Sequence, residues 1–584
     1  MSAVYDKAVH HTFVDSLRSV FLVDDAFPCL SDMFKSEQWL RRFKEPDRAA
    51  ALYREFRKRH LPCDIENTFR RGDIKMVERM RKCDLIVLDF HLDPDDSDNS
   101  KAIEILRRLA ASRHFNTVVV YTKAEKLSDV WLDIAANLRS DFDVEEFLKQ
   151  HETEHEWWQT TAELSKLQLP TETTMAEFLT GGIEGVSKPA KKAIGDEIVA
   201  IGGAGDRKVL VEAWLRKNVA ERQHPPVKGV NSTGDTALQG RFTNNGPHWL
   251  QCRGCFIAIV RKNSDDEVKH LMSGLDAALI DWKPNFLQIL VSEIQNNLEL
   301  ESFAADPRLF SDVERQVGLS HYLLSQLEED GDQIAAVEAV VDRILETLRH
   351  RISADKNLRT FGDKVLTDIR SELADAITSD KPIANAGALA HAPGKFDGQR
   401  ILFLLNSFLS TEHFSKSRIT TGTVFTDGTA HWMVTSPACD LTARPTGAKE
   451  TWSNELHPVK AILAVKLKLV DVSQSLKEAT QGKHAFLVDK EKFVPLEIFE
   501  KQTSQPAPEI FFVLDAGRTR FAAGKPATFK AIQVSRSNPK TSPRLVGQRS
   551  FSVLGQLRAN YASRVLQLTG AHFARIGIDF FKGA

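Results

Sequence analysis

A set of short apolar runs near the N-terminus constrains the fold more than any other feature of this chain. Segments with helical periodicity separate the runs, and each run ends on polar residues. Apolar runs of this length are typical of strands covered on both faces, and their alternation with helices predicts a parallel α/β sheet. The runs are FLV before Asp24 and Asp25, LIVL before Asp89, and VVVY before Thr122.

The polar ends of these strands are expected to form a site. The carboxyl ends of parallel strands meet at one edge of an open α/β sheet, where ligands bind. Three carboxylates that converge there, Asp24, Asp25 and Asp89, repel one another. A bound Mg²⁺ relieves that repulsion because it prefers oxygen ligands. Asp89 is then free to act as a nucleophile toward phosphorus and to form an aspartyl phosphate.

The same segments resemble the receiver domain of two-component response regulators, which has a flavodoxin-like α/β fold. FLVDD is similar to its first strand with the acidic pair, LIVLDFHL to its phosphoacceptor strand, and VVVYT to its fourth strand with the switch threonine. The resemblance implies that Asp24, Asp25, Asp89 and the backbone carbonyl of His91 hold Mg²⁺. It also implies that Asp89 accepts the phosphoryl group and that Thr122 moves to hydrogen-bond it.

Two positions depart from the pattern of this family. Asp93 stands where the family usually has a proline, and a proline follows one residue later. The family's lysine is expected soon after Thr122, but the nearest Lys-Pro pair begins at Lys188, behind an apparent helical insertion. Lys188 is therefore the candidate for this cation, and Lys123 is its rival.

The length of 584 residues is too great for one hydrophobic core, so the chain is expected to be multidomain. We predict a receiver domain over residues 1–200, including a helical insertion after the fourth strand. A mainly helical region is predicted over 205–384, with one strand-like segment, CFIAIVRK, at 255–262. A β-rich α+β domain is predicted over 400–584, where an Asp-Gly pair between two short apolar runs indicates a hairpin.

Composition limits the class of protein. The formal net charge is −2, so no overall positive field attracts nucleic acid or acidic membranes. The longest apolar run, ILFLLNSFL, is too short to span a bilayer. Six cysteines without the spacing of a disulfide framework favour a reducing compartment, so we expect a cytoplasmic protein.

Two further motifs outside the receiver segment are candidates, one for zinc binding and one for phosphotransfer. CRGC at 252–255, together with His248, has part of the spacing of a zinc site, and the alternative is a pair of small buried thiols. His350 lies on a predicted long helix, on the side opposite its apolar stripe, where a phosphotransfer histidine would be accessible.

The resemblance implies a signalling protein that accepts phosphate from a partner histidine kinase and has no enzymatic output of its own. The layout, an N-terminal receiver followed by a long region of unnamed fold, is similar to that of the phosphate-buffer receiver protein of the Detocs antiphage system. This likeness implies a role in antiviral defence, beside a second receiver-containing effector protein.

An alternative is a receiver that gates an enzymatic domain at 400–584. Cys439 follows a predicted strand and a proline turn, with Asp440 next to it. A nucleophilic cysteine needs a base, for which His431 and His457 are candidates. The competing interpretation is a buried cysteine with a capping aspartate.

Overall fold

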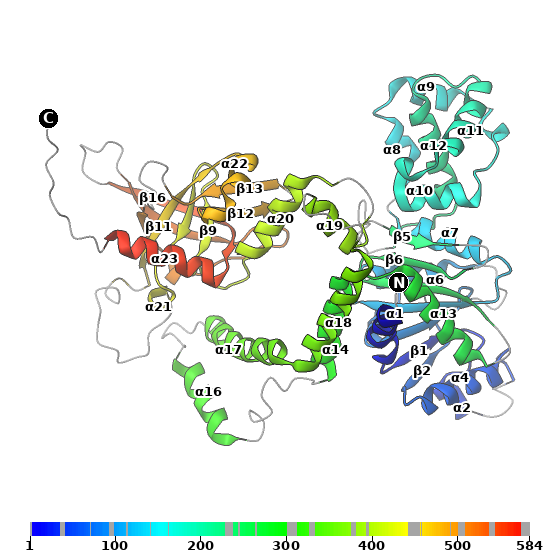
Figure 1. Ribbon diagram of the computed structural model, residues 1–584, viewed down its shortest axis with the longest axis horizontal. Helices are drawn as coiled ribbons and strands as arrows, with labels where there is room; N and C mark the ends of the chain where they lie inside the picture. Colours follow the sequence, from blue (N-terminus) through cyan, green and yellow to red (C-terminus); the bar gives the residue numbers. More distant parts are fainter. Residues whose placement is uncertain are drawn as a thin grey trace. The chain divides into compact units, whose positions relative to one another are not determined.

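The computed structural model of the chain divides into two compact units, each described by itself (Figure 1). Unit 1 comprises Met1–Asn296, Thr360–Asp375 and Leu389–His391, and unit 2 comprises Asn297–Arg359, Ala376–Ala388 and Ala392–Ala584. The residues that the structure describes are 3–35, 41–70, 72–92, 98–112, 115–139, 142–161, 163–227, 238–242, 246–262, 266–300, 312–325, 333–374, 381–392, 396–441, 456, 458–490, 492–499, 508–535 and 544–573.

Unit 1 is built on a seven-stranded sheet. Its strands are β1 (Val20–Val23), β2 (Cys63–Glu66), β3 (Leu85–Leu88), β4 (Asn116–Thr122), β5 (Leu238–Arg241), β6 (His248–Cys252) and β7 (Cys255–Arg261). The strands β2, β1, β3, β4 and β7 lie side by side in that order and pair in parallel. This is the 2-1-3-4-5 order of a doubly wound flavodoxin-like sheet. Beyond β7, the antiparallel strands β6 and β5 extend the sheet.

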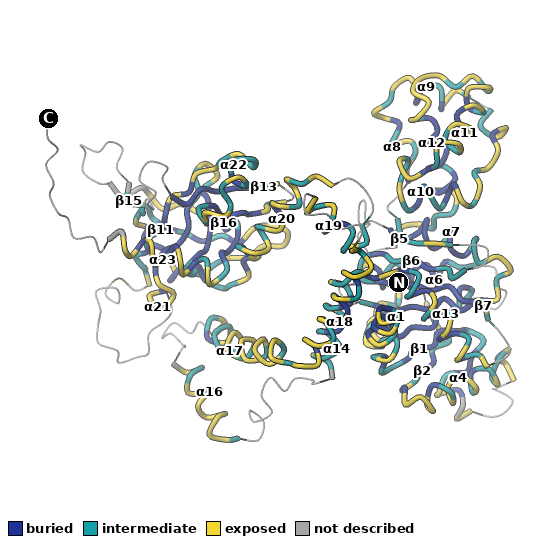
Figure 2. Tube along the Cα trace, in the orientation of Figure 1, coloured by how far each residue is buried: buried dark blue, intermediate teal, exposed yellow. Residues whose placement is uncertain are grey.

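Helices cover both faces of this sheet. On β4, Val118 and Val120 point into one core, whereas Val119 and Tyr121 point into the other, as the two-residue period of a strand requires. Figure 2 shows β1 and β7 as buried almost throughout. The helices that accompany this sheet are α1 (Ala3–His10), η1 (His11–Asp15), α2 (Leu30–Met33), α4 (Pro46–Lys58), α5 (Ile74–Met80), α6 (Ser100–Ala110), α7 (Leu127–Leu138) and α13 (Glu267–Trp282).

The two cores explain why the sequence shows unbroken apolar runs. Side chains of α5, α6 and α7 pack on one face, and side chains of α1, α4 and α13 pack on the other. A strand buried on both faces needs apolar residues at successive positions rather than at alternate ones. The prediction of an N-terminal parallel α/β sheet is confirmed.

A helical insertion separates α7 from the strands β5, β6 and β7. Its elements are α8 (Val144–Leu148), α9 (Glu152–Thr160), η2 (Glu163–Lys166), α10 (Glu172–Gly185), α11 (Lys188–Ala200) and α12 (Arg207–Ala220). Buried residues of the insertion, such as Phe178 and Leu215, belong to the same core as α6 and α7. The boundary predicted at residue 200 is therefore wrong, because β7 completes the sheet that β1 begins.

The helical segment predicted over 205–384 does not form a unit of its own. Alpha helices α14 (Phe286–Leu300) and α18 (Lys356–Glu372) contribute Ile289, Val365 and Ile369 to the second core of unit 1. The segment is rich in helices as predicted, but its strand at 255–261 and the greater part of these two helices belong to unit 1. Helical periodicity identified the elements without showing which core they join.

Unit 2 contains a nine-stranded antiparallel sheet, in which β10 pairs with both β9 and β11 and so closes a barrel. Its strands are β8 (Thr411–Glu412), β9 (Thr423–Thr426), β10 (His431–Val434), β11 (Lys460–Leu469), β12 (His484–Asp489), β13 (Lys492–Glu497), β14 (Pro508–Val513), β15 (Thr528–Ser535) and β16 (Arg544–Leu557). Its helices are α16 (Val313–Ser325), α17 (Gln333–Ala354), α19 (Pro382–Leu389), α20 (Gly398–Ser410), α21 (Ala438–Leu441), α22 (Val472–Lys477), η3 (Ala479–Gln481), η4 (Asp515–Gly517) and α23 (Ala559–Phe573).

Aromatic side chains fill the interior of this barrel. Phe425 contacts Phe511, Phe529 and Phe551 at ring-centroid distances of 5.1–5.5 Å, and Trp432 packs against the same cluster. These side chains are buried, so the barrel has a packed core rather than a channel. The hairpin predicted at the Asp-Gly pair is confirmed as β9 and β10.

The position of β7 inside the core of unit 1 generates a stability prediction. Phe256 is fully buried between β4 and α13, with its ring centroid 5.0 Å from that of Trp282. Phe256→Ala is expected to destabilise unit 1 by about 3–5 kcal/mol, because it leaves a cavity in a packed core. The measurement is hydrogen exchange of the β3 and β4 amides, which should lose protection.

Phe34→Ala is the matched control, because Phe34 is 84% exposed and its removal should change stability by no more than ~0.5 kcal/mol. Unchanged protection of β3 in Phe256→Ala would contradict the inclusion of β7 in this core.

Candidate functional site

Four parallel strands of the sheet in unit 1 end at one edge with charged or hydroxyl side chains. Asp24 follows β1, Asp89 follows β3, Thr122 ends β4 and Lys262 follows β7. Backbone hydrogen bonds hold these ends in register, from Asp89 N to Val23 O at 2.9 Å and from Lys262 N to Thr122 O at 2.8 Å. Parallel pairing thus brings together residues that lie far apart in the sequence.

The ammonium group of Lys262 lies between two carboxylates. Its Nζ is 2.7 Å from Asp24 Oδ2 and 2.7 Å from Asp89 Oδ2. The side chain of Lys262 is only 3% exposed, and that of Asp89 is 12% exposed. The Phe27 ring adds an apolar wall, with its centroid 5.9 Å from Nζ. Charge-assisted hydrogen bonds of this kind are strong where water is excluded.

The pKa values in this cluster are shifted by burial and by neighbouring charges. Burial raises the pKa of Asp89 to about 7, and the charge of Asp24 adds to the rise, whereas Lys262 and the His91 backbone amide oppose it. Burial alone would lower the pKa of Lys262, but Asp89 and Asp24 outweigh it and raise this pKa. The ionised form of Asp89 is therefore unfavourable in the folded protein, and the site favours the binding of a further cation.

The three acids predicted from the sequence do converge. One carboxylate oxygen each from Asp24, Asp25 and Asp89 lie within 4.8 Å of one another. An all-oxygen donor set of carboxylates suits Mg²⁺ rather than a softer metal. The residues present therefore fit the Mg²⁺ that a receiver site implies. The part assigned to the His91 carbonyl stays a prediction.

The switch residue predicted from the sequence also lies at this edge. Thr122 is fully buried, and its hydroxyl accepts a hydrogen bond of 3.2 Å from the Ala124 amide. Its backbone carbonyl is bonded to the amide of Lys262. Thr122 is therefore linked through its backbone to the residue that bonds Asp24 and Asp89.

Charged residues form a rim close to the acids. Lys123 is paired with Glu45, which precedes α4, and Arg48 bridges Glu45 to Glu267 at the start of α13. Burial would raise the pKa of Glu45, but the bonds from Lys123 and Arg48 outweigh it and lower this pKa. Lys123, the rival candidate for the receiver lysine, is therefore paired with Glu45 of the rim.

The position predicted for the receiver lysine is corrected by this geometry. Lys188 begins α11 in the helical insertion, whereas the cation beside the acids is Lys262. The sequence carried one signal for it, because CFIAIVRK is an apolar strand that ends in a charged residue like the other strands of the sheet. The strand was recognised, but its assignment to the middle region hid its place beside β4.

The CRGC motif is a tight connection between two strands. Cys252 and Cys255 are direct partners across β6 and β7, and both are buried. Burial raises the pKa of each thiol, which disfavours the thiolate that zinc requires. His248 pairs with Ile259 at the other end of β6. The reading as two buried thiols is favoured.

The residues suggested for a C-terminal active site lie at opposite ends of one strand. His431 begins β10, whereas Cys439 and Asp440 lie on α21 after that strand has ended. Burial lowers the pKa of His431, and the charge of Asp427 opposes this. His457 lies outside the described residues, as does Asp93 in the receiver loop.

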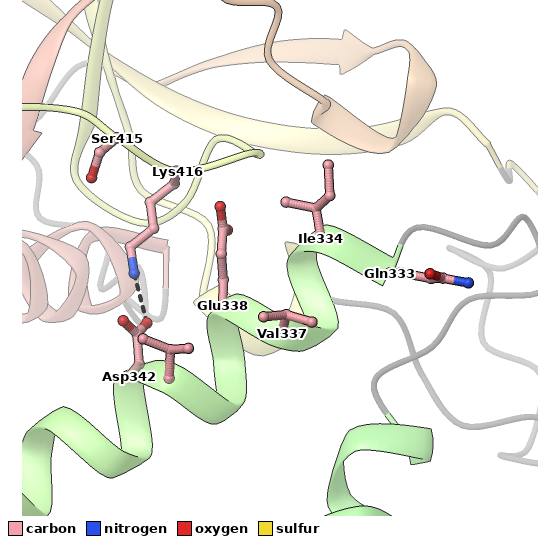
Figure 3. A pocket seen from close by; sticks show the side chains of 8 residues that line it. Gln333, Ile334, Val337, Glu338, Asp342, Ser415 and Lys416 are labelled. Carbon is pink, nitrogen blue, oxygen red and sulfur yellow. Dashed lines mark hydrogen bonds and ion pairs between the residues drawn. The ribbon is translucent and has the colours of Figure 1, made fainter. Parts of the chain in front are cut away.

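Unit 2 also contains an open pocket of ≈ 480 Å³ along the N-terminal half of α17 (Figure 3). Ile334, Val337 and Val341 line one side of it, and Lys416 Nζ binds Asp342 Oδ2 at 2.6 Å. None of the C-terminal residues considered above lines this pocket. His350, also on α17, is exposed as expected.

Comparison with known proteins identifies the N-terminal part of the chain. Residues 16–166 match the family model described as "Response receiver domain". The chain therefore contains a response-regulator receiver domain, as the resemblance implied. The matched region includes Asp24, Asp25, Asp89 and Thr122, and it ends before β7 and Lys262.

No curated protein and no solved structure matches the chain. In the part of the chain that the structure describes, no helix is both long enough and apolar enough to cross a bilayer.

The raised pKa of Asp89 predicts a pH dependence of stability without metal. Between pH 4 and pH 7 the folded protein binds a proton at Asp89 that the unfolded chain has lost, so the free energy of unfolding falls as pH rises. Asp89→Asn removes this dependence. In chelator at pH 8 the variant is expected to be more stable than the wild type, by on the order of 2–4 kcal/mol.

Thermal melts of both proteins at pH 4, 6 and 8 measure this difference. At pH 4 the two melting temperatures should coincide, because the carboxyl group is then neutral in the folded wild type. A constant difference across the series would contradict the burial of an ionised Asp89.

Proposed function

We propose that this chain is a phosphate-accepting response regulator that works with a partner histidine kinase. The observation that carries the proposal is the position of Lys262 Nζ, 2.7 Å from both Asp24 and Asp89 at the edge where Thr122 ends β4. A cation, a switch hydroxyl and an accessible carboxylate at one edge of a parallel sheet suit transfer of a phosphoryl group.

Asp89 is the proposed acceptor. Its Oδ1 would attack the phosphorus of a phosphohistidine, the N–P bond would break, and the imidazole would leave. The product is an acyl phosphate on Asp89, and attack of water on its phosphorus would release inorganic phosphate and restore the carboxylate. The fraction of Asp89 that is exposed supports access from solvent, whereas Asp24 is buried.

Asp24, Asp25 and Asp89 are the residues that would hold Mg²⁺. When bound, this ion supplies positive charge that stabilises the oxygens of the transferring phosphoryl group. Lys262 supplies a second, fixed positive charge from β7. Its ammonium would exchange part of its bonding to the carboxylate of Asp89 for a phosphoryl oxygen.

Thr122 is the proposed reader of the phosphorylated state. A phosphoryl group adds about −1.5 to −2 charges at pH 7, with strong acceptor oxygens. Thr122 would turn its hydroxyl from the Ala124 amide toward one of these oxygens. That movement would be passed to Lys123, which follows Thr122 and binds Glu45 on the rim.

We further propose that the protein relays or drains phosphate in an antiviral two-component system and has no output enzyme. This part rests on the layout of one receiver followed by a long second region, which is similar to the Detocs phosphate buffer. Its partners would be the kinase and a second receiver-containing effector in the cytoplasm, not nucleic acid or membrane. A receiver-gated enzyme in unit 2 is the competing function.

Phosphoryl labelling tests the acceptor and its cation. With Mg²⁺ and a small phosphodonor, Asp89→Asn should take up no label, because it keeps the size of the side chain and removes the nucleophile. Lys262→Met should be labelled on the order of 10²-fold more slowly than wild type, since it removes a charge that stabilises the transition state.

Lys188→Met is the matched control for the lysine and should be labelled like the wild type. Equal labelling of Asp89→Asn and wild type would refute the proposed acceptor. Slow labelling of Lys188→Met with normal labelling of Lys262→Met would show that Lys188, and not Lys262, assists the phosphoryl transfer.

Growth of cells that contain the kinase and the effector separates a buffer from an enzyme. If the protein drains phosphate, Asp89→Ala leaves more phosphate for the effector and should cause toxicity without a stimulus. If it is itself an effector, Asp89→Ala should silence the response. If the protein drains phosphate, Cys439→Ala and His431→Ala should behave as wild type. Loss of the response in either folded variant would instead indicate an active site in unit 2.

A further inference from the structure

A second cluster of metal-ligating side chains lies in unit 2, far along the chain from the receiver. His484 is the first residue of β12 and Glu497 is the last residue of β13, and the two are direct partners across the hairpin. Such partners project from the same face with Cβ atoms about 5 Å apart. Glu478 follows α22, just before the turn that leads into β12, and Figure 1 shows α22 beside this hairpin.

The ligating atoms of these three side chains converge on one point. One ring nitrogen of His484 and one carboxylate oxygen from each glutamate lie within 4.8 Å of one another. Glu478 Oε2 is 4.0 Å from His484 Nε2, which is too long for a hydrogen bond. The three groups therefore lie close enough for one ion to reach them all, and Glu478 Oε2 and His484 Nε2 do not hydrogen-bond directly.

Burial makes this arrangement costly without a cation at its centre. The side chain of His484 is 0% exposed, and Glu497 is 5% exposed. Among the residues that the structure describes, no hydrogen bond or ion pair engages the Glu497 carboxylate. The neighbour of Glu497 on the other side, Lys468 of β11, is exposed. A buried carboxylate is normally paired, hydrogen-bonded or bound to a metal.

The donor set indicates the kind of metal. An imidazole nitrogen with two carboxylate oxygens suits a first-row divalent transition metal, whereas the all-oxygen set of Asp24, Asp25 and Asp89 suits Mg²⁺. Three protein ligands also leave at least one coordination position for water. The side chain of Glu478 is 33% exposed, so solvent reaches the site from that side.

We propose that Glu478, His484 and Glu497 form a binding site for a divalent transition metal ion, with Zn²⁺ as its test ligand. The ion would join the end of α22 to the β12–β13 hairpin and would balance the charge of Glu497. This site is separate from the phosphate-accepting function and stands on different residues.

Equilibrium dialysis of the full chain against Zn²⁺ tests the proposal, with millimolar Mg²⁺ present to compete at the receiver acids. Wild type should bind one more equivalent of zinc than Glu497→Gln or His484→Gln does. If a variant still binds that equivalent, its affinity for zinc should be at least tenfold lower than that of wild type. Co²⁺ provides a second readout, because its visible absorption bands should change when the imidazole of His484 is removed. Glu412→Gln, an exposed glutamate of the same unit, is the control and should bind like wild type.

Glu478→Gln decides the matter if the two buried variants fail to fold, because Glu478 is partly exposed and its amide variant keeps the shape of the side chain. Equal zinc binding by wild type and folded Glu478→Gln would overturn the proposal. Loss of the same zinc in Asp89→Asn, with no loss in Glu478→Gln, would place the metal at the receiver and would equally overturn it. A failure of phosphoryl labelling leaves the zinc result unaffected, so the two proposals are tested apart.

Discussion

The receiver depends on one interaction, the bonding of the buried Lys262 ammonium to Asp24 and Asp89. Two carboxylates at neighbouring strand ends repel each other, and the low dielectric of a covered sheet edge strengthens that repulsion. Lys262 compensates part of it, yet the pKa of Asp89 stays raised. The same imbalance that makes the site unfavourable in the absence of a metal favours the binding of a further cation there. The stability of this edge and its affinity for a cation therefore follow from one charge arrangement.

That interaction requires β7 to lie beside β4, and this requirement explains the organisation of unit 1. The chain leaves the sheet after Thr122 and re-enters it at Leu238, and the strand that pairs with β4 begins only at Cys255. A long excursion of this kind is tolerable because the entropy of closing a loop grows slowly with its length. The inserted helices also bury residues in the core shared with α6 and α7, so the excursion contributes packing of its own. Strand β6 pairs with the other side of β7, so the edge of the sheet lies at the short strand β5.

Sequence reasoning placed the acids and the threonine at one edge of the sheet, but it did not place the lysine that lies beside them. Asp24, Asp25, Asp89 and Thr122 were found because apolar runs covered on both faces are conspicuous and their polar ends must meet. Lys262 was not found, since an apolar run such as CFIAIVRK shows that a strand exists and not which neighbours it pairs with. The pairing of β10 with β11, which closes the barrel, likewise cannot be read from an apolar run alone. The convergence of Glu478, His484 and Glu497 depends on hairpin register and on the end of α22, and no local spacing encodes it.

The order of these segments along the chain has a consequence for synthesis of the protein. Lys262 follows Asp89 by 173 residues. At translation rates of about 5–20 residues per second, the acids leave the ribosome on the order of 10–30 s before the lysine. Until then β4 is an open edge and the carboxylates lack their partner from β7. The nascent chain therefore passes through a stage in which the sheet lacks β7 and the unpaired edge of β4 could pair with another chain. Chaperones have their greatest opportunity to act at this stage.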